Sequence, residues 1–165
     1  MAKCPERNVV EKSRRFDDDN QGMKITDALI AEHRMFLEMF NFIEESLASA
    51  QTVSEAHALA RMVARLLESH AEAEEDLLLT ALDHVLEHKG QREVFHSEHG
   101  ELHDTFEKIT TEIDIAKMRQ LVKRAISASR KHFKHEEKTL FPLAEKTLSA
   151  ETLKDLGRAF FQKHE

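Results

Sequence analysis

Residues 69–79, SHAEAEEDLLL, place one histidine and four acidic residues directly before an apolar run. The stretch KHFKHEEKTLFP at residues 131–142 repeats this arrangement 62 positions later without a gap, and His70 aligns with His132. In both stretches a glutamate follows the histidine by four residues. Residues four apart lie on the same face of an α-helix. Each stretch therefore predicts a helix that presents an imidazole and a carboxylate at one place.

A second pair of segments repeats as well. AEHRMFLEMFNFIEE at residues 31–45 resembles SEHGELHDTFEKITT at residues 97–111, and a Glu-His pair occupies the same place in both. The histidines of these pairs are His33 and His99. Together the two repeats indicate two copies of a helical hairpin. Each copy brings one histidine from its first helix and a His-x-x-x-Glu motif from its second.

Composition and periodicity both favour a helical fold. A chain of 165 residues with four glycines and two prolines fits one domain and argues against a β protein. Apolar, histidine and glutamate residues recur every three or four positions within residues 29–47, 59–81, 95–113 and 118–140. Short connections between long helices make neighbours antiparallel. We therefore expect an all-α protein, an antiparallel up-down-up-down four-helix bundle.

Local signals mark the helix ends. Thr52 with Glu55 forms a capping box. Gly90 can end the second helix, and Asp114 can cap the fourth. Pro142 should kink or stop that fourth helix, because its ring excludes continued helical hydrogen bonding.

The two ends of the chain differ from the repeated part. Residues 1–23 lack an apolar signal region and read as a flexible leader, whereas residues 24–165 form the bundle. A short helix at about residues 150–163 should pack across one end of it. The alternative for the leader is docking on the bundle through Val9, Val10 and Phe16.

Residue counts also predict an irregularity in the second helix. In each hairpin, the distances from the histidines to the turn are similar on the two helices. Between His70 and His99, however, 18 residues precede the reversal and only 8 follow it. The excess of ten residues corresponds to about 15 Å of helix. We expect the second helix to kink or overhang within residues 79–89.

Charge and cysteine content limit the function. The net charge of −7 argues against nucleic-acid binding, and no apolar run is long enough to span a bilayer. The single cysteine, Cys4, cannot form an intrachain disulfide, which fits a reducing compartment and a cytoplasmic location. The sequence identifies no protein partner.

The repeated motifs predict a metal site. A carboxylate buried alone is very costly, so two of them beside four or five imidazoles indicate a multivalent cation. Imidazole and carboxylate ligands without a thiolate suit iron, manganese or zinc. One His-x-x-x-Glu motif is more typical of a surface pair, but two in-register copies on apolar stripes favour a site. The candidate ligands are His33, His70, Glu74, His99, His103, His132 and Glu136.

The third helix carries one motif that has no repeat mate. His103 and Glu107 are also four residues apart, but the first hairpin has Leu37 where the second has His103. We interpret the His103–Glu107 pair as a solvated surface feature. His103 itself remains a candidate ligand through its spacing from His99.

With these motifs, the chain resembles the hemerythrin and hemerythrin-like (HHE cation-binding) family over about residues 24–148. The set His33, His70-x-x-x-Glu74, His99-x-x-x-His103 and His132-x-x-x-Glu136 carries the resemblance. It implies a four-helix bundle with a non-haem di-iron centre, in which two iron ions share an oxo or hydroxo bridge. By this analogy Glu74 and Glu136 bridge the irons, His33 and His70 bind one iron, and His99, His103 and His132 bind the other.

The resemblance leaves two alternatives open. Oxygen-carrying hemerythrins have an aspartate five residues after the last histidine, a position held here by Glu137. The internal repeat favours Glu136, with Glu137 as the alternative bridge. The second alternative concerns His103. If it ligates, one iron keeps an open position; if it points elsewhere, both irons are open, and peroxide or nitric-oxide chemistry is favoured over oxygen carriage.

The expected function is a di-iron protein that binds a small molecule, dioxygen, for oxygen binding or sensing. The alternatives are a peroxide-decomposing (catalase-like) or nitric-oxide-reactive enzyme, and a metal-free helical module that binds a partner. Whether the chain is an enzyme stays open at this stage. A ferritin-like oxidase would need Glu-x-x-His motifs on two helices, and the sequence has one, from Glu93 to His96.

Overall fold

The structure is a computed structural model that describes residues 22–163, apart from the side chain of Lys89. Most of the expected leader, including Cys4, therefore lies outside the described residues. The alternative that the leader docks through Val9, Val10 and Phe16 lies outside them too.

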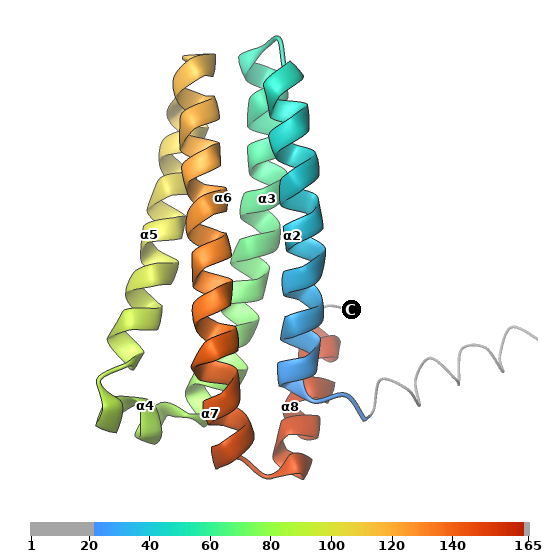
Figure 1. Cartoon of the computed structure of the whole chain (residues 1–165), viewed down its shortest axis with the longest axis vertical. Helices are drawn as coiled ribbons and strands as arrows, with labels where there is room; N and C mark the ends of the chain where they lie inside the picture. Colours follow the sequence, from blue (N-terminus) through green and yellow to red (C-terminus); the bar gives the residue numbers. More distant parts are fainter. Residues whose placement is uncertain (1–21, 164–165) are drawn as a thin grey trace, which may run out of the picture.

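The described chain consists of helices joined by short connections and contains no strand within residues 22–163, which confirms the all-α class. The elements are α2 (Ile25–Ser49), α3 (Val53–Ala73), the π-helix η1 (Glu74–Leu79), α4 (Asp83–Lys89), α5 (Arg92–Thr111), α6 (Ile115–Lys138), α7 (Leu140–Thr147) and α8 (Ala150–Lys163). The four long helices α2, α3, α5 and α6 lie side by side (Figure 1). The α2–α3 and α5–α6 connections lie at one end, and α4, α7 and α8 gather at the other (Figure 1).

The capping signals act as the sequence predicts. The Thr52 hydroxyl accepts a hydrogen bond from the Glu55 backbone N–H, and the Glu55 carboxylate accepts one from Thr52 N–H in return. The Asp114 carboxylate accepts from the first backbone N–H groups of α6. Gly90 ends α4 with a φ of 60°, in the left-handed region that glycine tolerates best.

The irregularity in the second helix is confirmed. The chain winds as a π-helix over Glu74–Leu79 and breaks at Leu82, whose φ of −101° and ψ of 2° are not helical. Residues 83–89 then form the separate helix α4. A π-helical turn adds a residue per turn and is frequent at functional sites. Here the π-helix begins at Glu74, one of the predicted ligands.

The last long helix stops where Pro142 requires it. A proline ring clashes with the carbonyl four residues earlier, here that of Lys138, at which α6 ends. Thr139 breaks the helix, and α7 begins at Leu140. The expected short terminal helix is α8, whose buried face contains Leu153, Gly157 and Phe160.

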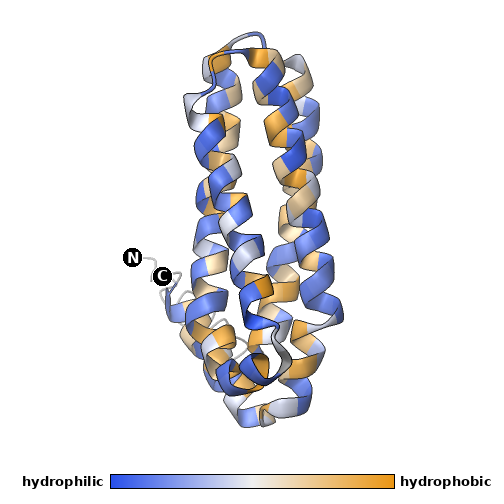
Figure 2. Cartoon of the chain, turned by 90° about the vertical axis from the view of Figure 1, so that its left-hand side faces the viewer, coloured by the Kyte–Doolittle hydropathy of each residue, from blue (hydrophilic) through white to orange (hydrophobic). Residues whose placement is uncertain are grey.

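The core consists of two apolar clusters with a polar layer between them. On α2, Leu29 belongs to one cluster and Phe36 to the other, and the buried His33 lies between them. On α5, His99 lies between Phe95 and Phe106 in the same way. Figure 2 shows hydrophilic residues along the outer faces of the long helices, and hydrophobic residues between them and at the end where α7 and α8 pack. None of the helices within residues 22–163 is long and apolar enough to cross a membrane.

Candidate metal centre

Four histidines, one from each long helix, meet in the polar layer. Nε2 of His33 on α2 lies 3.2 Å from Nε2 of His70 on α3. Nε2 of His99 on α5 lies 2.9 Å from Nε2 of His132 on α6. Each pair therefore directs two ring nitrogens at one position, which is the arrangement that a bound cation needs.

Two glutamates lie between the histidine pairs. Glu74 and Glu136 are both 0% exposed. The Glu136 carboxylate places one oxygen 3.2 Å from Nε2 of His33 and the other 2.6 Å from Nε2 of His132. The Glu74 carboxylate lies 3.4 Å from Nε2 of His99. Glu136 thus contacts both histidine pairs.

The donor atoms form two groups that could each hold a metal ion. Within each group the ligand atoms lie within 4.8 Å of one another. One group contains His33, His70 and Glu136; the other contains Glu74, His99, His132 and Glu136. The structure therefore offers two adjacent cation positions that share a carboxylate.

The donor set fits metal ions because its carboxylates lack other partners. Both side-chain oxygens of Glu74 and of Glu136 are buried and make no hydrogen bond to any described residue. Imidazole nitrogens lie within ion-pair distance of these carboxylate oxygens, but the contacts do not have hydrogen-bond geometry. The nitrogens and the oxygens instead face a common point. Buried carboxylates without hydrogen bonds are strongly destabilising. A cation held between these atoms would remove that cost.

Electrostatics separate the two carboxylates. Burial raises the pKa of Glu74 to about 7, and the neighbouring charge of Glu136 adds to the effect. Burial also disfavours the ionised form of Glu136, but contacts from His132 and His33 outweigh it and hold its pKa well below the usual range. Burial likewise opposes protonation of His99, but Glu136 and Glu74 together raise its pKa to about 10. Without metal, the site therefore retains protons that a cation would displace.

Each of the four histidines has a carboxylate at its other ring nitrogen, Nδ1. The distances are 3.0 Å from Glu137 to His33, 2.8 Å from Glu32 to His70, 2.8 Å from Glu98 to His132 and 3.8 Å from Glu75 to His99. At His33, His70 and His132 the carboxylate lies at hydrogen-bond distance, accepts the Nδ1–H and so fixes the tautomer that leaves Nε2 free to bind a metal. Glu75 lies at ion-pair distance from His99.

These supporting carboxylates follow the internal repeat, although sequence reasoning gave them no such role. Glu32 and Glu98 are the first members of the repeated Glu-His pairs, and Glu75 aligns with Glu137. The repetition of the glutamates beside the histidines was the signal that could have identified them. Of the two adjacent glutamates, Glu136 faces the cluster, whereas Glu137 is 40% exposed and contacts His33 Nδ1.

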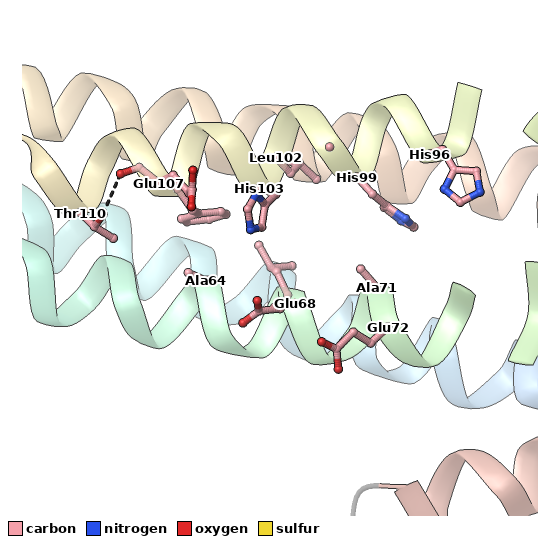
Figure 3. Close-up of a pocket in the computed structure, with 13 residues that line it drawn as sticks. Ala64, Glu68, Ala71, Glu72, His96, His99, Leu102, His103, Glu107 and Thr110 are labelled. Carbon is pink, nitrogen blue, oxygen red and sulfur yellow. Dashed lines mark hydrogen bonds between the residues drawn. The ribbon is translucent and has the colours of Figure 1, made fainter. Parts of the chain in front are cut away.

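His103 is the predicted ligand that the structure does not bring to the cluster. Its side chain is 61% exposed, and the nearest acidic atom lies 4.0 Å away on Asp104. Four residues along α5 from His99, it is displaced by about 6 Å and rotated by about 40° around the helix. This rotation turns it toward the space between α5 and α3 (Figure 3).

The surroundings of the cluster are asymmetric. Toward α6, the ring of His33 stacks on Phe133 with 4.0 Å between centroids, and Phe141 lies at 5.4 Å. Between α3 and α5, a groove of about 570 Å³ has both His99 and His103 in its lining (Figure 3). His99 is 14% exposed, so the cluster reaches solvent on this side.

Comparison with known families agrees with the geometry. A family model, the hemerythrin HHE cation binding domain, matches residues 24–144, which include all six clustered side chains. No curated protein and no solved structure gave a significant match. The matched span covers most of the chain and contains the two histidine pairs with Glu74 and Glu136. The chain belongs to the hemerythrin HHE cation-binding domain family.

Proposed function

We propose that this chain is a non-haem di-iron protein that uses its two irons to react with a small oxidant. His33 and His70 would bind one iron, and His99 and His132 the other. Glu74 and Glu136 would bridge them. The observation that carries the proposal is the convergence of four Nε2 atoms on two buried carboxylates that have no hydrogen-bond partner among residues 22–163. Imidazole and carboxylate donors suit iron.

The position of His103 bears on which oxidant is used. With His103 outside the cluster, one iron would be held by His33, His70 and Glu136. The other would be held by two imidazoles with Glu74 and Glu136, so both would keep open positions. Adjacent open positions favour peroxide, which can contact both metals, over oxygen carriage at a single open iron. We therefore favour peroxide decomposition. Bound irons would supply the two electrons that, with two protons, convert one peroxide to two water molecules. They would regain them when a second peroxide gives up two electrons and two protons to become dioxygen.

The protein's own residues would organise this chemistry. The carboxylates hydrogen-bonded at Nδ1 hold the imidazoles of His33, His70 and His132 in one orientation, as metal-binding histidines generally require. Phe133 and Phe141 cover the His33 side and exclude water from it. The α3–α5 groove leaves the His99 side accessible to a small solute.

Reversible binding or sensing of dioxygen is the second candidate. The aromatic wall beside His33 favours it, because an apolar diatomic molecule is compatible with a dry apolar surface. For a metal-free module that binds a partner, the orphaned carboxylates of Glu74 and Glu136 would be an unexplained cost. The single cysteine fits a reducing compartment, so either activity would suit a cytoplasmic location.

The test combines metal analysis with gas measurement. Protein loaded anaerobically with ferrous salt should contain two irons per chain and should release dioxygen when peroxide is added. Glu136→Gln should lose stoichiometric iron, whereas Glu101→Gln, which removes an exposed carboxylate away from the cluster, should keep both irons. A chain that stays iron-free contradicts the metal centre. Reversible optical bands in air without gas release from peroxide would instead favour oxygen binding.

A further inference from the structure

Three side chains with metal-binding chemistry follow one another along the groove wall. His99, His103 and Glu107 occur every four residues on α5, and all three line the groove between α3 and α5. Successive members are about 6 Å apart along the helix axis. Glu68 and Glu72, also four residues apart, line the facing wall on α3 (Figure 3).

This row of side chains leads to the accessible part of the metal centre. The other five members of the cluster are at most 4% exposed, whereas His99 is 14% exposed and lines the groove. Phe133 and Phe141 close the His33 side. A solute that reaches the buried carboxylates without unfolding the bundle would therefore pass His99.

Two carboxylates and one glycine of the groove make no contact with another described residue that would explain them structurally. Neither the Glu72 nor the Glu107 carboxylate forms an ion pair within the described part of the chain, although Glu68 pairs with Arg65 at 2.8 Å. Gly100 also lines the groove, and a Cβ added there would meet no atom within 4 Å. A glycine inside a helix costs about 1 kcal/mol relative to alanine. Packing against neighbouring atoms therefore does not explain why α5 has a glycine at position 100.

We propose that the α3–α5 groove is the route by which metal ions load into the centre, an inference that rests on the proposed di-iron site. Glu107 and His103 would bind the incoming cation transiently and would pass it to His99, with Glu72 on α3 at the His99 end of the groove (Figure 3). The charges fit a cation, whereas peroxide and dioxygen are neutral and gain nothing from acidic walls.

Two further observations agree with transient binding at these residues. No group of three ligand atoms within residues 22–163 lies close enough to hold a metal here, so an ion would not be trapped on the way. The first hairpin has Leu37 and Asn41 at the positions that correspond to His103 and Glu107. Loading would therefore take place on one side of an otherwise repeated site.

The experiment measures the rate of metal uptake rather than activity. Metal-free protein is mixed with Co²⁺ in a stopped-flow instrument, and the visible absorption of bound Co²⁺ is followed. We expect His103→Gln and Glu107→Gln together to slow loading roughly tenfold. The final spectrum and the stoichiometry of two ions per chain should remain those of the unchanged protein. Glu101→Gln removes an exposed carboxylate from the same helix outside the groove and should load at the original rate.

Three outcomes would overturn the proposal. One is an unchanged rate in the double variant. Another is an equal slowing in Glu101→Gln, which would reduce the effect to net charge. The third is a changed final spectrum in His103→Gln alone, which would make His103 a permanent ligand. Failure of the unchanged protein to bind any Co²⁺ at equilibrium would instead reject the metal centre itself, and the loading route with it.

Discussion

The Glu32 carboxylate lies 2.8 Å from Nδ1 of His70, a residue of the other helix in the same hairpin. In the second hairpin Glu98 holds His132 at the same distance. The internal repeat has therefore preserved more than the metal-binding side chains themselves. It has also preserved the hydrogen bonds that orient them.

This relationship predicts a similar effect from two distant substitutions. Glu32→Gln and Glu98→Gln should each weaken metal affinity by roughly ten- to a hundredfold, since each removes the charged acceptor that orients an imidazole. Competition against a chelator of known affinity measures the effect. Glu101→Gln serves as the control. An unchanged affinity in both variants would show that these carboxylates serve packing alone.

The metal-free protein should lose stability as the pH rises through neutrality, because of Glu74. The folded pKa of this carboxyl is about 7 and its ordinary value is 4.5, so its stabilising contribution is complete below pH 4.5. The contribution declines as the pH rises and is lost above about 7. Relative to Glu74→Gln, the loss should be on the order of 3 kcal/mol.

Urea denaturation of both metal-free proteins between pH 4 and 9 tests this prediction. The difference in unfolding free energy between the two should change with pH across that window. Two parallel curves would mean that Glu74 is not protonated in the folded metal-free site.

Metal binding should reverse this pH dependence. The bound ions compete with the protons on Glu74 and His99, both of which have raised pKa values, so affinity should grow as the pH rises. The increase in melting temperature caused by Zn²⁺ should therefore be larger at pH 8 than at pH 6. Calorimetry in buffers of different ionisation enthalpy should also detect proton release on binding. A Zn²⁺ effect that is the same at both pH values would contradict the site described above.

Replacing Gly100 or Gly157 by alanine should change the stability of the protein in opposite directions. Gly100→Ala should stabilise the protein by about 1 kcal/mol, because helix propensity improves and the added methyl meets open space. Gly157→Ala should destabilise it, because the added Cβ would overlap the backbone oxygen of Met23 where α8 packs. Thermal unfolding of the two variants makes the comparison. A stabilised Gly157→Ala would show that α8 is not held as tightly as the structure indicates.

The sequence alone determined the helices and most of the candidate site. Capping and breaking depend on residues within a few positions of each other, so Thr52, Asp114 and Pro142 could be read locally. The repeat supplied the ligands in the same way, because side chains four apart share a helix face whatever surrounds them. Even the break at Leu82 lies where counting residues along the chain predicted an irregularity.

Tertiary structure alone decided which of the remaining groups face the candidate metal centre. Glu136 and Glu137 are neighbours in sequence, and only the rotation of α6 against the other helices directs one inward and the other to His33 Nδ1. His103 satisfies the spacing rule but is turned toward the groove, because the orientation of α5 is fixed by contacts far away in sequence. Periodicity defines a face to within a turn, whereas coordination requires an atom to lie within a few tenths of an ångström of its place.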